Sequence, residues 1–136
     1  MTVGAEEAAR WTAAARETTG ADIEVLWREG WVVRVGDVFF PSPDLLDRSD
    51  PDWKRWAARP QKHIRDAADY WFHVYQPRRG DVIADIGAGR GEDVFAFSRE
   101  IGEAGRVWAI EAHPGTFAIL DRFCELNGLS NVTRLN

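Results

Sequence analysis

Residues 82–91 read Val-Ile-Ala-Asp-Ile-Gly-Ala-Gly-Arg-Gly, a short β-branched strand pattern that runs into a loop with three glycines. Residues 92–101 follow with the apolar spacing of a helix, and residues 107–110 form a second short apolar run. Glycine has no Cβ, so a backbone or a ligand can approach such a loop closely. The stretch therefore predicts a strand-helix-strand unit with a nucleoside site after its first strand.

The alternation of strand and helix continues to the end of the sequence. Residues 114–127 have helical apolar spacing with Gly128 after them, and residues 132–135 begin a third strand. Buried strands joined by helices imply a parallel sheet with right-handed crossovers. The predicted fold class is α/β: a Rossmann-like doubly wound parallel sheet, of which this chain holds the first βαβαβ half.

The residues before the glycine loop have a different pattern. Residues 6–18 predict a helix, and the alternating runs 23–27, 31–35 and 38–40 predict a small antiparallel meander. We therefore expect two domains. Residues 1–76 would form N-terminal helices and the meander, and residues 77–136 the N-terminal half of the Rossmann-like domain.

Two helices are expected between the meander and the glycine loop. Ser49 or Asp50 is predicted to cap a short helix that stops at Pro60, and a longer helix follows. In the longer helix an apolar stripe is expected at steps of four, three and four residues. Its members are Ile64, Ala68, Trp71 and Tyr75.

Composition narrows the function classes for this chain of 136 residues. Its 17 basic and 22 acidic residues give a net charge of -5, which disfavours nucleic acid as a partner. No apolar run approaches the roughly 18 residues of a membrane span, so no membrane partner is expected. Residues 1–25 lack a signal-peptide pattern and Cys124 has no disulfide partner, so we expect a cytoplasmic protein with Cys124 buried by packing. No residue set has metal-ligand spacing.

An acid, Glu111, ends the second strand of the predicted unit. A carboxylate there can accept hydrogen bonds from both hydroxyls of a ribose. The alternative is a solvated Glu111 beside a glycine turn that only packs under a helix. The combined spacing favours the nucleoside site.

The charges around the loop indicate which nucleoside is bound. A dinucleotide loop reads Gly-x-Gly-x-x-Gly and holds a pyrophosphate at the helix N-terminus. Here Gly91 comes one residue early, and Asp85, Glu92 and Asp93 crowd that place with negative charge. This pattern favours a cation such as S-adenosylmethionine, with Asp85 near its ammonium and the helix N-terminus near its carboxylate. Glu92 and Asp93 are equally explained as first-turn acids that offset the helix dipole.

Residues 82–136 resemble the class I methyltransferases that depend on S-adenosylmethionine, and among them the FkbM-type family. The resemblance rests on Asp-Ile-Gly-Ala-Gly-Arg-Gly at 85–91, on a strand with an acid and a nearby proline at 107–114, and on Leu-Asn-Gly-Leu at 126–129 with Asn131-Val132. This sequence departs from the family by placing Ala-His between the acid and the proline.

The resemblance implies S-adenosylmethionine as cofactor and assigns roles along the chain. It places the methionine part near Asp85 and Gly87, the ribose at Glu111, and the adenine at Ala112 or His113. The predicted cofactor-binding residues are the loop and the acids with their neighbours: Asp85, Gly87, Ala88, Gly89, Gly91, Glu92, Glu111, Ala112 and His113.

The family's domain continues beyond a third strand, so we expect this chain to be a fragment. With the strands in the order third, second, first, both helices cover one face, and the N-terminal helices are expected to cover the other. The edge of the first strand would stay unpaired, open to a partner chain or a second copy.

The predicted function is methyl transfer from S-adenosylmethionine, with oxygen of a small molecule or sugar as acceptor by resemblance. No catalytic residue is assigned: His63 and His73 precede the loop and could border the acceptor, but histidines so placed are more often solvated or paired with neighbours. The abundant tryptophans are expected in the core, Trp27, Trp31 and Trp71 because they lie on apolar stripes. The alternatives are a nicotinamide-binding oxidoreductase fragment and a non-catalytic nucleoside-binding or interaction module.

Overall fold

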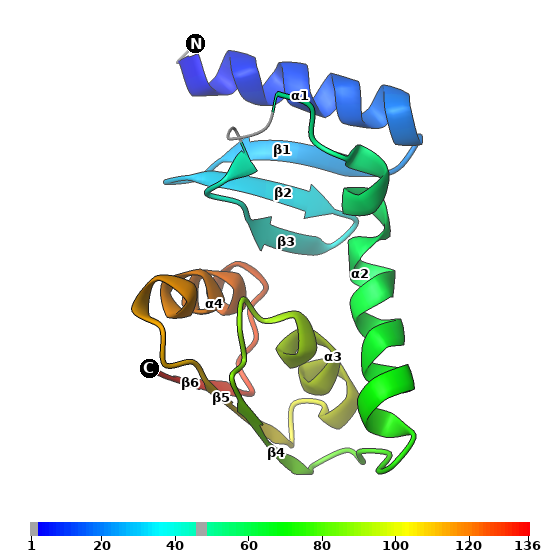
Figure 1. The fold of residues 1–136 in the computed structure, drawn as a ribbon, viewed down its shortest axis with the longest axis vertical. Helices are drawn as coiled ribbons and strands as arrows, with labels where there is room; N and C mark the ends of the chain where they lie inside the picture. Colours follow the sequence, from blue (N-terminus) through cyan, green and yellow to red (C-terminus); the bar gives the residue numbers. More distant parts are fainter. Residues whose placement is uncertain (1–2, 46–48) are drawn as a thin grey trace. The chain divides into compact units, whose positions relative to one another are not determined.

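The computed structural model describes residues 3–45 and 49–136. The chain divides into two compact units, Met1–Pro60 and Gln61–Asn136 (Figure 1). The division falls within a helix, 16 residues before the expected boundary at residues 76 and 77.

The first unit is a helix followed by a three-stranded meander, as predicted. Helix α1 spans Val3–Thr19, and strands β1 (Ile23–Trp27), β2 (Trp31–Val35) and β3 (Val38–Pro41) follow. The strands pair antiparallel in the order β1-β2-β3.

Helix α1 packs on the meander through small side chains and hydrogen bonds to β1. Ala8 and Ala15 are buried. The Thr12 hydroxyl accepts a hydrogen bond of 2.9 Å from the Val25 amide, and the Arg16 guanidinium donates one of 2.9 Å to the Ile23 carbonyl. These contacts satisfy polar groups of β1 that its pairing with β2 leaves free.

The expectation of two helices separated at Pro60 is wrong. A single helix, α2, spans Trp53–Ala67 with Pro60 inside it. Proline in a helix lacks the amide hydrogen and usually ends it. Packing stabilises the turn before the proline here, because the Arg59 guanidinium lies 4.2 Å from the ring centroid of Trp56. The cap is also not as expected: Asp52 accepts a hydrogen bond of 3.0 Å from the Arg55 amide.

A turn of π-helix, η2 (Ala68–Phe72), continues α2 and overturns the predicted apolar stripe. Ala68, Trp71 and Tyr75 are exposed, Trp71 by 46%. A π-turn inserts a residue, which rotates the following side chains by about 100° relative to a regular helix. Phe72 now packs on Phe97, with 5.8 Å between ring centroids.

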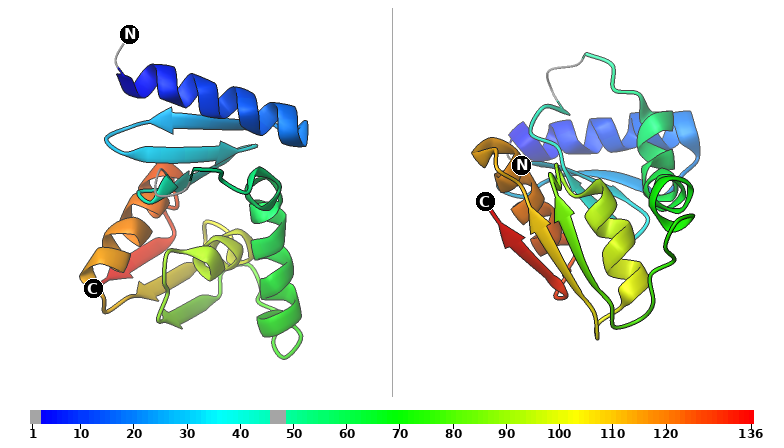
Figure 2. Two further views of the ribbon diagram at one scale, coloured as in Figure 1. Left: turned by 45° about the horizontal axis from the view of Figure 1, so that its top comes forward. Right: turned by 60° about the horizontal axis from the view of Figure 1, so that its bottom comes forward.

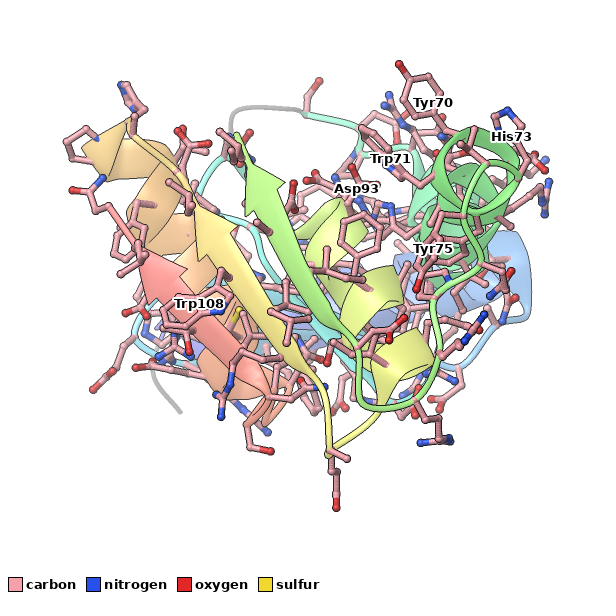
Figure 3. The ribbon with its side chains drawn as sticks, turned by 90° about the horizontal axis from the view of Figure 1, so that it is seen from below. Tyr70, Trp71, His73, Tyr75, Asp93 and Trp108 are labelled. Carbon is pink, nitrogen blue, oxygen red and sulfur yellow. The ribbon has the colours of Figure 1, made fainter. Side chains whose placement is uncertain are left out.

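The second unit contains the predicted parallel sheet. Strands β4 (Val82–Ile86), β5 (Arg106–Ile110) and β6 (Val132–Leu135) pair parallel in the order β4-β5-β6 (Figure 2). Helices α3 (Glu92–Ile101) and α4 (Pro114–Leu126) connect them and lie on the same face of the sheet (Figure 3). The Rossmann-like α/β fold class is therefore confirmed.

The core of this unit lies between the sheet and the two connecting helices. Val94 of α3, Val107 of β5 and Leu120 of α4 are completely buried. Cys124 is 1% exposed, which confirms its expected packing role, and burial raises the pKa of its thiol to about 11. The buried faces of α3 and α4 follow the apolar spacing seen in the sequence.

Within the second unit, large apolar side chains are exposed on the other face of the sheet. Ile86 is 81% exposed, and Val82 and Trp108 are exposed as well; Figure 3 shows Trp108 on this face. The residues after α2 pack on α3 through Phe72 and Phe97, on the covered side. As expected, β4 lies at the edge of its sheet.

The tryptophan expectation is confirmed for Trp31, which is buried, and wrong for Trp27 and Trp71, which are exposed. Trp53, which the sequence did not single out, is buried. Of the three tryptophans placed in the core because they lie on apolar stripes, only one is buried.

Asn131 ties helix α3 to the start of β6. Its amide nitrogen donates to the carbonyls of Ser98 (3.0 Å) and Gly102 (2.8 Å), and its side-chain oxygen accepts a hydrogen bond of 2.6 Å from the Ser98 hydroxyl. Asn131 and Ser98 are buried, so the hydrogen bonds between them replace bonds that water would otherwise make.

We expect Asn131→Leu to lower the free energy of unfolding by about 2–4 kcal/mol, because two buried carbonyls and a hydroxyl lose their partner. Urea unfolding of the variant checks this. Ser130→Ala is the control, since Ser130 is exposed and adjacent, and should change the value by less than about 0.5 kcal/mol. Equal stability of Asn131→Leu and the natural protein would show that the network does not contribute.

Candidate cofactor site

The glycine loop between β4 and α3 is held to the neighbouring strand by its backbone. The amides of Gly87 and Ala88 both donate to the Ile110 carbonyl, at 2.8 and 3.0 Å. Gly87, Gly89 and Gly91 have φ of +81°, +60° and +103°, which side chains with a Cβ rarely adopt. The sequence Gly-Ala-Gly-Arg-Gly thus allows a sharp turn at the carboxyl end of the sheet.

Two of these glycines also leave room for different neighbours. A Cβ at Gly91 would lie 2.7 Å from the Phe123 ring, so its absence lets α3 pack closely on α4. A Cβ at Gly87 would meet nothing within 4 Å. The backbone of Gly87 therefore faces open space, where a ligand can approach.

Glu111 follows β5 and binds the loop. Its carboxylate accepts hydrogen bonds from the amides of Gly89 (3.0 Å) and His113 (2.8 Å), one on each oxygen. Glu111 therefore has a structural role in the loop, and its binding of a ribose stays a prediction. A carboxylate has about four lone-pair positions. Acceptor positions for two ribose hydroxyls therefore remain.

Asp85 is the residue before the last of β4, and no basic side chain of the described residues lowers its pKa. Its Oδ2 is buried and has no hydrogen-bond partner among the described residues. Burial, and then the negative charges of Asp93 and Glu92, raise the pKa of Asp85 to about 6. A cation placed at this oxygen would stabilise the ionised form.

Helix α3 begins at Glu92 with backbone donors available for an anion. Its N-cap residue is Gly91, which has no side chain, so no side chain caps the helix. The first amides of a helix lack partners within it and attract a carboxylate. Glu92 and Asp93 lie in this first turn. The backbone amides could therefore bind one small anion, while the neighbouring side chains are negatively charged.

The remaining predicted residues lie after β5. His113 begins α4, and its Nδ1 accepts a hydrogen bond of 3.2 Å from the Thr116 amide. Ala112 is exposed between Glu111 and His113. The turn therefore continues from the proposed ribose position, and the His113 ring already has a structural role as a helix cap.

The two histidines before the loop have different surroundings. His63 is buried and has an interaction partner, whereas His73 is exposed.

Sequence reasoning missed a group of residues near the start of α3. Tyr70 and Trp71 on η2 lie close to Asp93, as Figure 3 shows. The Trp71 indole lowers the pKa of Asp93 and so opposes the rise that burial causes. The adjacent aromatic pair was visible in the sequence, but its position depends on the π-turn.

Within residues 3–45 and 49–136, no three histidine, cysteine or acidic residues form a set that could hold a metal ion. In the same ranges, every helix is too short or too polar to cross a membrane.

Comparison with family models found no match, and comparison with curated proteins found none either. Among solved structures, partial overlaps occur with proteins whose names specify S-adenosylmethionine. One is an S-adenosylmethionine-dependent methyltransferase from Aquifex aeolicus, 22% identical with a TM-score of 0.45, over 54% of this chain and 44% of that one.

Two further overlaps are of the same kind. A fibrillarin from Aeropyrum pernix, solved with natively bound S-adenosylmethionine, is 18% identical with a TM-score of 0.42, over 82% of this chain and 56% of that one. An arsenic(III) S-adenosylmethionine methyltransferase from Chlamydomonas reinhardtii is 25% identical with a TM-score of 0.40, over 54% and 31%. The chain thus spans less than two thirds of the length of each of these three proteins.

Proposed function

We propose that this chain binds S-adenosylmethionine and serves in methyl transfer to a small-molecule acceptor. The observation that carries the proposal is Oδ2 of Asp85, which is buried and has no partner among residues 3–45 and 49–136, beside a glycine loop and a helix N-terminus without a side-chain cap. A buried carboxylate oxygen without a partner costs free energy, and a ligand ammonium would offset that cost.

The parts of the cofactor match the polar groups around the loop. Asp85 would hold the ammonium, and the first amides of α3 would hold the carboxylate of the methionine part. Glu111 has acceptor positions left for the ribose, and Ala112 or His113 would border the adenine. Gly87 has no side chain and faces open space, so the ligand could lie close to its backbone.

The charge of the site supports this ligand over a dinucleotide. Asp85, Glu92 and Asp93 interact electrostatically, and the pKa of Asp85 rises because of its two acidic neighbours as well as burial. A pyrophosphate placed there would add two negative charges to this group. S-adenosylmethionine brings an ammonium and a sulfonium instead.

S-adenosylmethionine, when bound, supplies a methyl group on a sulfonium, a centre already activated for displacement. The residues of this chain would bind and orient that donor, and orientation alone accounts for much of the rate of such reactions. The finer assignment, an FkbM-type enzyme that methylates oxygen of a small molecule or sugar in the cytoplasm, rests on the resemblance of residues 82–136. The open edge of β4 would admit a partner chain.

We expect S-adenosylhomocysteine to bind and NAD not to bind in calorimetric titrations of the 136-residue chain. Glu111→Gln should weaken S-adenosylhomocysteine binding about 10-fold or more, because hydrogen bonds to a charged acceptor are lost. Glu125→Gln is the matched control: it removes the same charge from an exposed position on α4 and should leave the affinity unchanged.

Binding of NAD in place of S-adenosylhomocysteine would support the oxidoreductase alternative. Binding of neither by the folded chain would contradict the proposal. Urea unfolding of Glu111→Gln separates lost ligand contacts from a loosened loop, because Glu111 also binds the Gly89 and His113 amides.

The affinity for S-adenosylhomocysteine should rise with pH through about 6. The ligand ammonium favours ionised Asp85, whose pKa is about 6 without ligand, so protonation at lower pH competes with binding. We expect about tenfold weaker binding at pH 5 than at pH 7.5, by titration at both values. Asp85→Asn cannot ionise and should bind weakly with a much flatter pH dependence. An equally steep pH profile in that variant would assign the dependence to another group.

Asp85→Asn should also stabilise the unliganded chain at neutral pH. The folded pKa of Asp85 lies above its value of 3.8 in an unfolded chain, so the folded state binds more protons and stability falls as pH rises from about 4 to about 6. Above pH 6 the substitution should raise the free energy of unfolding by about 1–3 kcal/mol, and below pH 4 by less. Urea unfolding at pH 4 and pH 7.5 measures the difference. A destabilised variant at pH 7.5 would show that Asp85 is paired in solution.

A further inference from the structure

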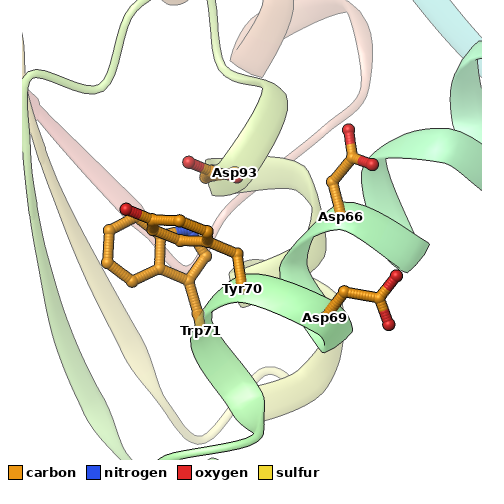
Figure 4. Close-up of a pocket in the computed structure, with 5 residues that line it drawn as sticks. All are labelled: Asp66, Asp69, Tyr70, Trp71 and Asp93. Carbon is orange, nitrogen blue, oxygen red and sulfur yellow. The ribbon is translucent and has the colours of Figure 1, made fainter.

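A hollow of about 460 Å³ lies beside the start of α3, apart from the glycines of the loop. Its walls combine two aromatic rings with carboxylates, and Figure 4 shows Tyr70 and Trp71 beneath Asp93. The lining residues are Asp66, Asp69, Tyr70, Trp71 and Asp93. Ligand sites of small molecules have volumes of about this size.

The two rings are held in place although they face solvent. Tyr70 and Trp71 form an edge-to-face pair with 4.7 Å between centroids, and Tyr70 is 68% exposed. Trp71 contacts Phe97 of α3 at 6.3 Å, and its indole lowers the pKa of Asp93. Packing and this interaction with Asp93 thus orient the indole, while burial in the core does not explain the exposed ring of Tyr70.

The charged side chains that line the hollow are all acidic. None of its lining residues is basic, and Lys62 forms an ion pair with Asp66 at the rim. Burial raises the pKa of Asp93, as do the like charges of Glu92 and Asp66, while the Trp71 indole opposes the rise. The ionised form of Asp93 is therefore stabilised by the indole but has no cation of its own.

We propose that this hollow binds an alkylammonium group of the methyl acceptor, so that the acceptor is a small organic amine. The inference rests on the proposed function, because Asp93 lies in the first turn of α3 next to the loop that would hold the cofactor. Ring faces attract organic cations, and a carboxylate beside them adds a charge-assisted hydrogen bond.

The aromatic walls favour an organic cation over a metal ion. A hydrated metal ion gains little from contact with Tyr70 and Trp71, whereas an alkylammonium also buries apolar surface against them. The described residues contain no set of three metal ligands at this place.

The ammonium would anchor the acceptor and would not itself be methylated. A protonated amine has no lone pair, so the attacking atom is a second group of the same molecule, such as a hydroxyl. In the transfer, its oxygen forms a bond to the methyl carbon, the carbon-sulfur bond breaks with its electron pair left on sulfur, and the hydroxyl proton goes to solvent. The acceptor class is therefore an amine that also carries a nucleophilic group.

The test uses benzylammonium chloride as the probe and benzyl alcohol as its uncharged match. We expect the indole N–H signal of Trp71, assigned by its absence in Trp71→Phe, to shift on titration with benzylammonium and much less with benzyl alcohol. Tyr70→Leu should weaken binding about 3-fold. Asp93→Asn should weaken it about 5-fold while keeping an oxygen for the Trp71 indole.

Glu103→Gln is the control, since it removes one charge from an exposed position after α3 and should leave benzylammonium binding unchanged. Equal shifts with both probes, or equal weakening by Glu103→Gln and Asp93→Asn, would overturn the inference and indicate a general acidic surface. Titration of the same samples with S-adenosylhomocysteine tests cofactor binding separately from ammonium binding. Benzylammonium binding without S-adenosylhomocysteine binding would retain the ammonium site and remove its role as acceptor site.

Discussion

The parallel pairing of β4 with β5, closed by the Ile110 carbonyl, is the constraint on which the rest of the second unit depends. That carbonyl accepts hydrogen bonds from Gly87 and Ala88 as the chain leaves β4. The closure turns the chain sharply into α3 and places Asp85 and Glu111 at the same edge of the sheet. Two carboxylates 26 residues apart in the sequence are thereby brought to one loop. The chemistry of the site follows from this backbone geometry more than from any single side chain.

The carboxylates of Asp85 and Glu111 differ in their hydrogen bonding. Glu111 has two backbone donors, so its charge is satisfied and it stabilises the loop. Asp85 has a buried oxygen without a donor and two acidic neighbours, Glu92 and Asp93, that raise its pKa. A residue selected only for stability would have a partner or an uncharged replacement. The unfavourable state of Asp85 is therefore better explained by a ligand than by folding, as strained or frustrated groups often mark functional sites.

The sequence predicted the second unit closely because its elements are short, have clear apolar runs and are bounded by glycine or proline. The strand at 82–86, the helix at 92–101 and the strand at 132–135 agree with the structure to the residue. The errors lie where local rules compete with packing. Pro60 is a helix breaker by propensity, yet the turn before it is held by ring contacts. No local pattern predicts that a π-turn follows, and this turn decides which side chains of η2 face solvent.

The same rotation explains why the loop acids were predicted and the neighbouring hollow was not. Asp85 and Glu111 are placed by strand ends, which the apolar runs reveal. Tyr70 and Trp71 reach Asp93 only because η2 departs from 3.6 residues per turn. The hollow and the glycine loop are then close to the same negative charges, because Asp93 and Glu92 also raise the pKa of Asp85. A field of one sign concentrates cations and repels anions. Donor and acceptor would then be selected by the same charges, and an anionic acceptor would be disfavoured before it reached the cofactor.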